Sequence, residues 1–418
     1  MKVLIIGSGA RESAIAWKYS KSKCVSGVFI APGNAGTDKI GTNLNIDPFD
    51  FNAIIEACQS HKIDAVFVGP EAPLSAGIVD ALQAKGIYAI GPNKEAAQLE
   101  SSKTFSKQFM LRHNLPTAKA WEFADPALFE NHVKSLSGKW VVKKNGLAAG
   151  KGVLESDNQA EMIAFGNEIL KSDTLIIEEF LAGYEISVFV LSDGKNYIVL
   201  PPCSDFKKAK ENDLGPNTGG MGSICPVPWV NSELKKNIRH NIIEPTMEGL
   251  KMDGINYKGI VYIGLMITQE GPKILEYNVR FGDPETQVLL PVIDIDFGDL
   301  THSLIEGTIQ NIPVSENEKS AVGVVIAAEG YPGPYKKNQP VTIDENLSES
   351  DALVFHASTI VENGQVLTKG GRCFSVVGMG KDTIDAAVKA YEHIDKVCFP
   401  GSWYRKDIGK KFFMDEDI

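Results

Sequence analysis

Glu276, Asn278 and Arg280 stand two residues apart, and the positions between them, Tyr277 and Val279, are apolar. In a β-strand alternate side chains point to the same face, so the carboxylate, the amide and the guanidinium are expected together. Mg²⁺ prefers oxygen ligands, and the arginine fork pairs with a carboxylate or a phosphate. The segment therefore predicts a metal site at Glu276 and Asn278 beside an anion-binding arginine. A structural ion pair would account for one carboxylate and one arginine, but not for the amide.

A second candidate site lies between Lys143 and Lys151, which enclose a run containing Gly146, Ala148 and Gly150. Small residues let the backbone approach a bulky anion closely. The run is not a Walker A loop, because Gly152 rather than Ser or Thr follows the second lysine. It is typical of a flap that closes over a triphosphate, although a solvated turn with surface lysines is the simpler alternative.

An apolar run ending in Glu178 and Glu179 is followed by Phe180, Leu181 and Glu185. Backbone donors and acceptors at the end of such a strand are suited to an adenine edge, and a carboxylate beyond it to ribose hydroxyls. A solvated loop explains this pattern equally well.

The segment 214–222 is rich in glycine and has few side chains to cover its N–H groups. It predicts an anion nest or a lid that lies close over a ligand, with Asp205 and Lys207 reaching the same pocket. The alternative is a loop that only requires positive φ angles.

The run 7–12, Gly-Ser-Gly-Ala-Arg-Glu, invites a dinucleotide-binding interpretation. The motif stops at two glycines, however, and Ala31-Pro32 stands where an acidic residue would end the second strand. A phosphate or ribose contact and a plain tight turn therefore remain the alternatives for this loop.

These segments require elements that hold them in place. Residues 3–6, 28–31, 65–68 and 88–90 are continuous apolar runs, which predict buried parallel strands, with helices at 51–61 and 75–85 between them. Ligands of such wound sheets bind beyond the carboxyl ends of the strands. We therefore expect a binding crevice at the Gly- and Pro-rich tips of these strands.

The rest of the chain predicts a helix at 103–113 and strands at 140–143, 175–180 and 186–191. Residues 258–267 and 272–277 are expected to pair antiparallel around a turn at 268–271. A further unit begins near residue 318, with strands at 321–327, 354–359 and 372–378 and a helix at 383–394.

Composition excludes several classes of protein. The net charge of −11 disfavours a nucleic-acid surface, which needs clustered Lys and Arg. The six cysteines form no CxxC pair, which predicts free thiols in a reducing compartment. The initial apolar run is too short for a signal peptide, and no run of about 18 apolar residues occurs. A soluble cytoplasmic protein with no membrane partner is expected.

The motifs resemble those of the phosphoribosylamine–glycine ligase family within the ATP-grasp superfamily. The resemblance runs from end to end, and its most specific part is Gly-Pro-Asn-Thr-Gly-Gly-Met-Gly at 215–222. It also covers 7–12, 31–37, 68–74, 146–152, 280–285, 370–372 and 405–409. It implies an α/β and α+β multidomain fold with four units: an N-terminal wound parallel-sheet domain at 1–102, an ATP-grasp lid with its preceding helix at 103–185, a central catalytic domain at 186–316, and a small C-terminal α+β domain at 317–418.

The resemblance also implies roles for individual residues. Lys143 and Arg280 are expected to act in catalysis, and Glu276 and Asn278 to hold Mg²⁺ or Mn²⁺. The residues implied in ATP binding are Lys103, Lys143, Gly150, Lys151, Gly152, Glu178, Glu179, Phe180, Leu181 and Glu185. The residues implied at the other substrates are Gly9, Glu12, Asn34, Glu71, Asp205, Lys207, Asn217, Thr218, Gly219, Gly220, Arg280, Asp283 and Arg372. The sequence departs from the family's usual pattern at Ser13 and Phe206, where His is usual, and at Asn145, where Asp is usual.

The implied reaction joins glycine to 5-phosphoribosylamine with ATP, giving glycinamide ribonucleotide, ADP and phosphate, most simply in a monomer. A carboxylate must gain a leaving group before an amine attacks it, so a glycyl phosphate intermediate is expected. Three rivals remain: another ligase of the superfamily, a nicotinamide-dependent oxidoreductase, and a non-catalytic nucleotide-binding regulator. The signatures at 205–222 and 280–285 disfavour the first, and retention of Lys143, Glu276 and Asn278 disfavours the last.

Overall fold

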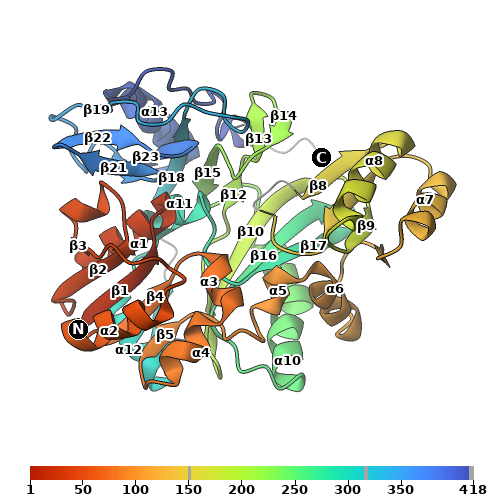
Figure 1. Ribbon diagram of the computed structural model, residues 1–418, viewed down its shortest axis with the longest axis horizontal. Coiled ribbons are helices and arrows are strands. Elements are labelled where there is room, and N and C mark those ends of the chain that lie inside the picture. The colour runs from red at the N-terminus through yellow and green to blue at the C-terminus, as the bar shows by residue number, and fades with distance from the viewer. Residues whose placement is uncertain (149–151, 315–318, 414–418) are drawn as a thin grey trace.

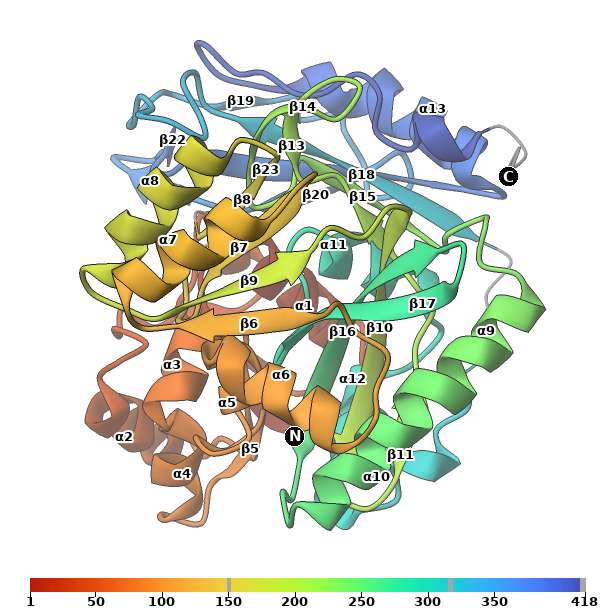
Figure 2. The ribbon, with the colours of Figure 1, turned by 90° about the vertical axis from the view of Figure 1, so that its right-hand side faces the viewer.

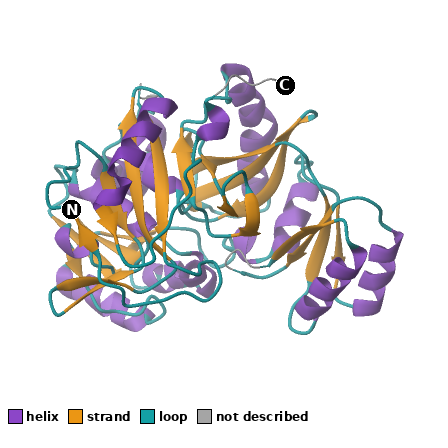
Figure 3. Cartoon of the chain, turned by 90° about the horizontal axis from the view of Figure 1, so that it is seen from above, coloured by secondary structure: helices purple, strands orange, loops and turns teal. Residues whose placement is uncertain are grey.

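The computed structural model describes residues 1–148, 152–314 and 319–413. Figure 1 shows the N-terminal sheet and the C-terminal sheet stacked at one side of the molecule and an outer unit at the other, with the central sheet between them. Seen from above, the outer unit stands away from the rest of the chain (Figure 3).

The N-terminal domain is a five-stranded parallel sheet in the order β3-β2-β1-β4-β5. Its strands are β1 (Lys2–Gly7), β2 (Gly27–Pro32), β3 (Thr42–Asn43), β4 (Ala65–Val68) and β5 (Tyr88–Ile90). The apolar runs are buried on both faces, which explains why they lack alternation. The chain order changes direction at β1, so the loop at Gly7 lies at the switch point where wound sheets bind ligands.

Five helices flank this sheet: α1 (Ala10–Ser20), α2 (Phe51–His61), α3 (Glu71–Ala76), α4 (Ile78–Gln83) and α5 (Gln98–Ser101). The predicted bounds of α2, β4 and β5 are confirmed. The single helix predicted at 75–85 is wrong, because Gly77 adopts φ +98 and separates α3 from α4. A left-handed glycine ends a helix even where the apolar periodicity continues.

The outer unit is a four-stranded antiparallel sheet in the order β6-β9-β7-β8. It consists of β6 (Ala120–Phe123), α7 (Pro126–Ser135), β7 (Trp140–Lys144), β8 (Val153–Ser156), α8 (Gln159–Leu170) and β9 (Leu175–Glu179). Both helices cover one face (Figure 2) and share a separate apolar core with the strands. Helix α6 (Lys103–Arg112) precedes the unit and lies beside the central sheet through Phe109 and Tyr277.

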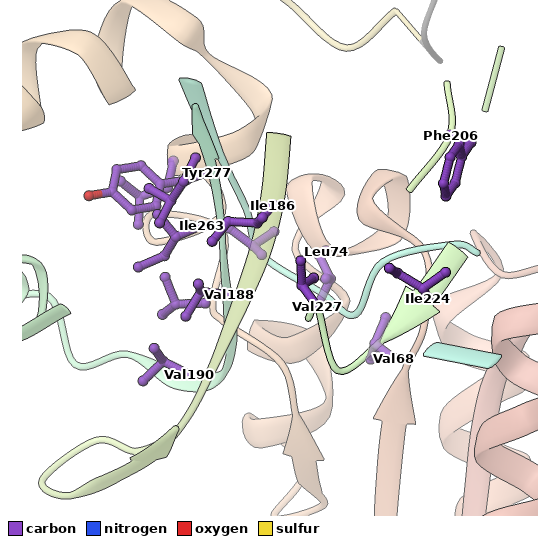
Figure 4. Packing of buried hydrophobic residues seen from close by; sticks show 14 of the residues in the cluster. Val68, Leu74, Ile186, Val188, Val190, Phe206, Ile224, Val227, Ile263 and Tyr277 are labelled. Carbon is purple, nitrogen blue, oxygen red and sulfur yellow. The ribbon is translucent and has the colours of Figure 1, made fainter. Parts of the chain in front are cut away.

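The central sheet has the order β11-β10-β16-β17 and is antiparallel throughout. Its strands are β10 (Tyr184–Asp193), β11 (Tyr197–Val199), β16 (Lys258–Thr268) and β17 (Gly271–Asn278). The predicted hairpin is confirmed, because Thr268 pairs with Gly271 across its turn. One face packs on a helical segment formed by α9 (Ser232–Ile238), the π-helix η2 (Arg239–Ile243) and α10 (Glu244–Met252). Figure 4 shows Ile186, Val188, Val190 and Ile263 on that face.

The C-terminal sheet has the order β12-β15-β18-β23-β20, and two of its strands come from the glycine-rich region before residue 226. Its strands are β12 (Ser204–Asp205), β15 (Gly222–Cys225), β18 (Ser320–Ala327), β20 (Leu353–His356) and β23 (Arg372–Gly380), and α13 (Thr383–His393) packs against it. The predicted strand at 354–359 is instead divided between β20 and β21 (Thr359–Glu362). Because β12 and β15 pair into this sheet, the C-terminal unit holds the chain on both sides of the glycine-rich region.

The remaining short elements complete the chain. They are η1 (Thr37–Lys39), β13 (Lys208–Lys210), β14 (Leu214–Asn217), α11 (Glu285–Val292), α12 (Phe297–Glu306), η3 (Ile309–Asn311), β19 (Thr342–Ile343), β22 (Gln365–Thr368), η4 (Ile394–Lys396), β24 (Val397–Cys398) and η5 (Lys410–Phe412). All six cysteines are free thiols, as predicted. Within 1–148, 152–314 and 319–413, no helix combines the length and the apolar character needed to cross a bilayer.

The N-terminal domain meets the central sheet where Gly259, at the start of β16, approaches Gly91 after β5. A Cβ at Gly259 would stand 2.8 Å from the Gly91 Cα, and the φ angle of Gly259 is +113. Gly271 provides a matched position on the adjoining strand, because its φ is +111 and no atom lies within 4 Å of its ideal Cβ.

We predict that Gly259→Ala lowers the free energy of unfolding more than Gly271→Ala. Both variants bear the strain of a positive φ, about 1–2 kcal/mol. Only Gly259→Ala must also displace a neighbouring backbone, which adds about 1–3 kcal/mol. Urea denaturation of both proteins measures the difference. Equal losses would contradict the close approach of the two domains.

Candidate active site

A cavity of about 210 Å³ lies where α6, the outer unit and the central sheet meet. We call it the charged cavity. Seven carboxylates line it: Glu71, Glu100, Glu178, Asp205, Glu276, Asp283 and Glu285. Five cationic side chains also line it: Lys103, Lys107, Lys143, Lys207 and Arg280. Among the described residues the lining contains neither Cys nor His, so its chemistry rests on charge and hydroxyl groups.

Glu178 of β9 bridges two buried lysines. Its Oε2 lies 2.6 Å from Lys143 Nζ on β7, and its Oε1 lies 2.7 Å from Lys107 Nζ on α6. Burial alone would raise the pKa of Glu178, but the two ammonium groups outweigh burial and lower it. Burial likewise would lower the pKa of Lys143, and the Glu178 carboxylate reverses this shift. Lys143 is therefore charged and held in position before any ligand arrives.

Lys207 occupies a second charged position, next to β12. Its Nζ lies 3.2 Å from Asp205 Oδ1 and donates to the Glu185 carboxylate on β10. Burial raises the pKa of Asp205 to about 7, against the opposing effect of Lys207. The pKa of Glu185 is lowered, because Lys207 outweighs the effect of burial there. Lys207 thus connects the glycine-rich region to the central sheet.

Arg280 follows β17 and is held by two carboxylates of the N-terminal domain. Its guanidinium donates to Glu100 Oε1 at 2.8 Å, and its Nε lies 3.4 Å from Glu71 Oε2. The buried Nε has no hydrogen-bond partner among the described residues. Burial raises the pKa of Glu100 to about 7, while Arg280 opposes that shift. The arrangement fixes the guanidinium between the two carboxylates, with its buried Nε beside Glu71.

Glu276 and Asn278 both line the charged cavity, as expected for residues on one face of β17. In the register with β16, Asn278 pairs with Tyr262 and Glu276 with Gly264, which confirms that they share a face. Asn278 Oδ1 accepts from Arg280 at 3.0 Å. The structure therefore brings a carboxylate, an amide oxygen and a guanidinium together at one end of β17.

The glycine-rich region differs from the open anion nest that its sequence suggests. Thr218 N donates to Lys207 O at 2.7 Å, Gly219 N to Tyr331 Oη at 3.0 Å, and Gly220 N to Thr218 Oγ1 at 2.9 Å. These N–H groups are thus satisfied within the protein. Glycine is required at position 220 by a φ of +106, and a Cβ there would stand 2.4 Å from Pro284 Cδ. The positive φ of Gly220 is what the simpler loop alternative requires, and a covering role over a ligand remains a prediction.

Arg372 of β23 attaches this loop to the strand end at Asp283. Its guanidinium donates to Gly220 O at 3.2 Å and lies 3.2 Å from Asp283 Oδ2. Burial would raise the pKa of Asp283, but Arg372 and other cations reverse the shift and lower it. The C-terminal domain therefore positions residues of the charged cavity that come from two other parts of the chain.

The first glycine loop encloses a carboxylate of the chain itself. Glu12 accepts from Gly9 N at 2.6 Å and from Arg11 Nε at 2.6 Å. A Cβ at Gly7 or Gly69 would meet the Glu12 side chain at 2.7 and 2.1 Å. The glycines thus make room for Glu12 at the N-terminus of α1, where a dinucleotide would place its phosphates. A substrate contact by Gly9 or Glu12 stays a prediction.

Asn34 is also bonded within the protein. Its side chain donates to Ser8 O, Ser13 Oγ and His356 O at 2.9–3.0 Å, and its Oδ1 accepts from Gly36 N. Asn34 therefore joins the first glycine loop to the C-terminal domain. These hydrogen bonds do not test its predicted contact with substrate, which stays a prediction.

The structure gathers most of the predicted residues but not all of them. Those lining the charged cavity are Glu71, Lys103, Lys143, Gly152, Glu178, Asp205, Lys207, Thr218, Gly219, Glu276, Asn278, Arg280 and Asp283. Those outside its lining are Gly9, Glu12, Asn34, Glu179, Phe180, Leu181, Glu185, Asn217, Gly220 and Arg372. Gly150 and Lys151 lie outside the described residues.

The implied adenine hinge lies at the end of β9, beside the charged cavity. Glu179 N donates to Lys119 O at 3.0 Å, and the Phe180 ring is covered by Lys139 Nζ at 4.0 Å from its centroid. Leu181 is buried. These contacts hold the segment in place, and its role in adenine binding stays a prediction.

Two lining residues of consequence were missed by the sequence interpretation. Lys107 follows Lys103 by four residues on α6, so helical spacing would have placed both ammonium groups on one face. Glu100 gives no such local signal, because its partner Arg280 is 180 residues away.

The three departures from the family pattern have structural roles here. Ser13 Oγ donates to His356 O at 2.7 Å and is buried. Asn145 Oδ1 accepts from Thr104 N at 2.9 Å at the start of α6. Phe206 is buried between Lys411, 4.6 Å from its ring centroid, and Arg405, at 5.3 Å. None of the three lines the charged cavity.

Comparison with known proteins shows first to which class of protein the chain belongs. Residues 101–286 match the family model described as phosphoribosylglycinamide synthetase, ATP-grasp (A) domain. The biotin carboxylase domain of Hydrogenobacter thermophilus 2-oxoglutarate carboxylase has a TM-score of 0.72 over 96% of this chain and 91% of its own. Its identity is 17%, so that likeness shows the fold alone. The chain is an ATP-grasp protein.

Matches along the full length of the chain identify the particular family. Residues 1–100 and 321–411 match the N and C domain models of phosphoribosylglycinamide synthetase. The chain is 41% identical to phosphoribosylamine–glycine ligase of Caldanaerobacter subterraneus, covering 98% of this chain and 99% of that protein. The Thermotoga maritima phosphoribosylamine–glycine ligase structure has a TM-score of 0.84 at 35% identity, covering 98% and 100%. The chain belongs to the phosphoribosylglycinamide synthetase family.

Some relatives are longer. The trifunctional purine biosynthetic protein adenosine-3 of Gallus gallus is 42% identical over 98% of this chain, which spans 42% of that protein.

We predict that Glu178→Gln lowers the free energy of unfolding by about 3–5 kcal/mol at pH 7, because two buried lysines lose their counter-charge. The pKa of Glu178 is lowered on folding, so its ionised form stabilises the protein above its ordinary pKa of 4.5. The difference from wild type should therefore shrink as the pH falls below that value. Denaturant titrations from pH 7 down to about pH 3 measure it, because the loss occurs below pH 4.5.

Glu155→Gln is the control, because Glu155 pairs with Lys139 at the surface at 3.2 Å. Its effect should stay within about 0.5 kcal/mol at every pH. A Glu178→Gln effect of that size at pH 7 would contradict the proposed charge bridge.

Proposed function

We propose that this chain is an ATP-dependent ligase that joins glycine to 5-phosphoribosylamine, giving glycinamide ribonucleotide, ADP and phosphate in purine biosynthesis. The observation that carries the proposal is the charged cavity, in which Lys143 of the outer unit meets Glu276, Asn278 and Arg280 of the central sheet. Family membership over the whole chain supports the choice of substrates.

The nucleotide is proposed to bind between the outer unit and the central sheet. Lys143 and Lys103 line that side of the charged cavity, and Leu147 and Gly152 of the small-residue run reach it. A triphosphate placed there would meet the Lys143 ammonium group, whose pKa is raised and which Glu178 holds in position. Such fixed charges stabilise a phosphoryl group in transfer, because they need no reorganisation during the reaction. Phosphate contacts by Gly150 and Lys151 belong to the same proposal.

Glu276 and Asn278 fit a divalent cation. The lining carboxylates outnumber the lining cations, and a triphosphate adds further negative charge, so a bare nucleotide would be repelled. One carboxylate and one amide oxygen suit Mg²⁺, which takes its other ligands from phosphate and water. Mg²⁺, or Mn²⁺, held there would neutralise charge on the phosphates.

The chain's own residues would then activate glycine. Arg280 lines the charged cavity, and its guanidinium is proposed to pair with the glycine carboxylate. The carboxylate oxygen attacks the γ-phosphorus, its new bond to phosphorus forms, and ADP leaves. The amine of phosphoribosylamine then attacks the glycyl carbon, and phosphate departs with that oxygen while the amine loses a proton. Asp205, whose pKa is about 7, faces the same cavity.

The glycine-rich region is proposed to cover the phosphoribosylamine. Thr218 and Gly219 line the charged cavity, and Arg372 holds their loop by donating to Gly219 O. Excluding water matters here, because water would otherwise hydrolyse the acyl phosphate. The proposal includes action as a cytoplasmic monomer on these small molecules, with no nucleic acid or membrane partner.

The test is ADP release measured with freshly made phosphoribosylamine and each candidate acid. We expect release to require both glycine and phosphoribosylamine, with alanine slower by about 10–200-fold, the range for one extra carbon in a fitted pocket. Bicarbonate replaces glycine as the control for a carboxylating ligase of the same fold. Release that persists with bicarbonate, or without the amine, would show that the proposed substrates are wrong.

A further inference from the structure

A second cavity, of about 340 Å³, lies between the central sheet and the helical segment α9–η2. We call it the apolar cavity. Val188 of β10 lines it and pairs with Ile263, whereas Tyr262 and Asn278 of the charged cavity point to the other face of the sheet. Figure 4 shows Val188 and Ile263 on the same side of the sheet. The two cavities are therefore separated by the sheet.

The wall of the apolar cavity is mostly hydrophobic, and the charged residues that line it among the described residues are cationic. The wall includes Val188, Ile198, Leu200, Val230, Ile238 and Ile243. The charged lining residues are Lys235 and Arg239, one turn apart, and no carboxylate lines it within the described chain. Such a combination, apolar walls with a few convergent polar groups, is typical of small-molecule sites.

Two polar groups at this cavity lack a hydrogen-bond partner. In the described residues neither the exposed Arg239 guanidinium nor the Tyr197 hydroxyl makes a hydrogen bond or ion pair. The nearest acidic side chain along the helix, Glu244, is paired with His240 at 3.3 Å. Arg239 and Glu244 both act electrostatically on the Tyr197 hydroxyl. Within residues 1–148, 152–314 and 319–413, the Arg239 guanidinium itself has no acidic partner.

A local irregularity places these groups. Residues Arg239–Ile243 form a π-helical turn between α9 and α10. A π-turn widens the helix by one residue and is frequent at functional sites. Here its first residue carries the cation and its last residue, Ile243, lines the apolar wall. The turn thus sets a charge beside a hydrophobic cavity.

We propose that the apolar cavity binds an amphipathic organic carboxylate, with its apolar body inside and its carboxylate on Arg239 and the Tyr197 hydroxyl. The volume is roughly twice the ~150 Å³ of an apolar cavity that holds benzene, so it admits a body larger than one aromatic ring. This site is distinct from the charged cavity and does not depend on the ligase reaction.

Isothermal titration of the full chain with decanoate, and with its neutral amide decanamide, tests the proposal. We expect one saturable site for decanoate that saturating ATP does not displace. Arg239→Ala should weaken decanoate binding at least about fivefold, because one charge-assisted contact is lost, and should leave decanamide binding unchanged. Lys236→Ala is the matched control, since Lys236 is an exposed lysine of α9 outside the lining, and should bind decanoate as the wild type does.

A second variant tests the apolar part. Val199→Phe, on the edge strand β11, narrows the cavity and should weaken decanoate and decanamide alike, with an unchanged melting temperature in their absence. No saturable binding, competition with ATP, or equal affinity in Arg239→Ala and wild type would each overturn the proposal. So would a dimer in sedimentation that Arg239→Ala dissociates, because a second copy would then be the occupant.

Discussion

The buried carboxylate of Glu178 between Lys107 and Lys143 is the interaction on which the site depends. It joins the helix α6 to two strands of the outer unit, β7 and β9. Removing it would leave two ammonium groups buried without a counter-charge, which proteins tolerate poorly. With it, Lys143 is charged, oriented and ready to meet a phosphate. The bridge therefore links the stability of the outer unit to the electrostatics of the charged cavity.

The rest of the charged cavity follows the same principle, with cations held by carboxylates from other domains. Arg280 lies between Glu100 and Glu71 of the N-terminal region, and Arg372 of the C-terminal sheet holds Asp283. Each pair joins segments far apart in sequence. The N-terminal and C-terminal domains thus act as the support that orients the groups of the central sheet. A preorganised site of this kind needs little rearrangement when charge moves during phosphoryl transfer.

Local patterns in the sequence were sufficient for many elements and for one part of the site. Apolar runs and helical periodicity predict β4, β5 and α2 to the residue, and strand alternation places Glu276 and Asn278 on one face. These features depend on neighbours two to four residues away. The metal assignment itself remains a prediction, because the register shows a shared face and not a bound ion.

Features that depend on distant contacts were not predictable in this way. Gly77 interrupts a helix whose apolar periodicity continues, because it adopts a φ of +98. The pairing of β12 and β15 with the C-terminal sheet, and that of Glu100 with Arg280, involves residues about a hundred or more positions apart. The sequence also did not show that N–H groups of the glycine-rich region are bonded within the protein, because one acceptor, Tyr331 Oη, lies 112 residues from its donor Gly219.

The central claim is that the charged cavity activates a carboxylate directly by phosphoryl transfer from ATP. Glycine labelled with ¹⁸O in its carboxylate tests this, with the released phosphate analysed by mass spectrometry after turnover with ATP and phosphoribosylamine. The account predicts one labelled oxygen in each phosphate, because the carboxylate oxygen attacks phosphorus and leaves with it when the amine attacks carbon. Phosphate that carries only solvent oxygen would show that ATP hydrolysis is separate from carboxylate activation, and would contradict the account.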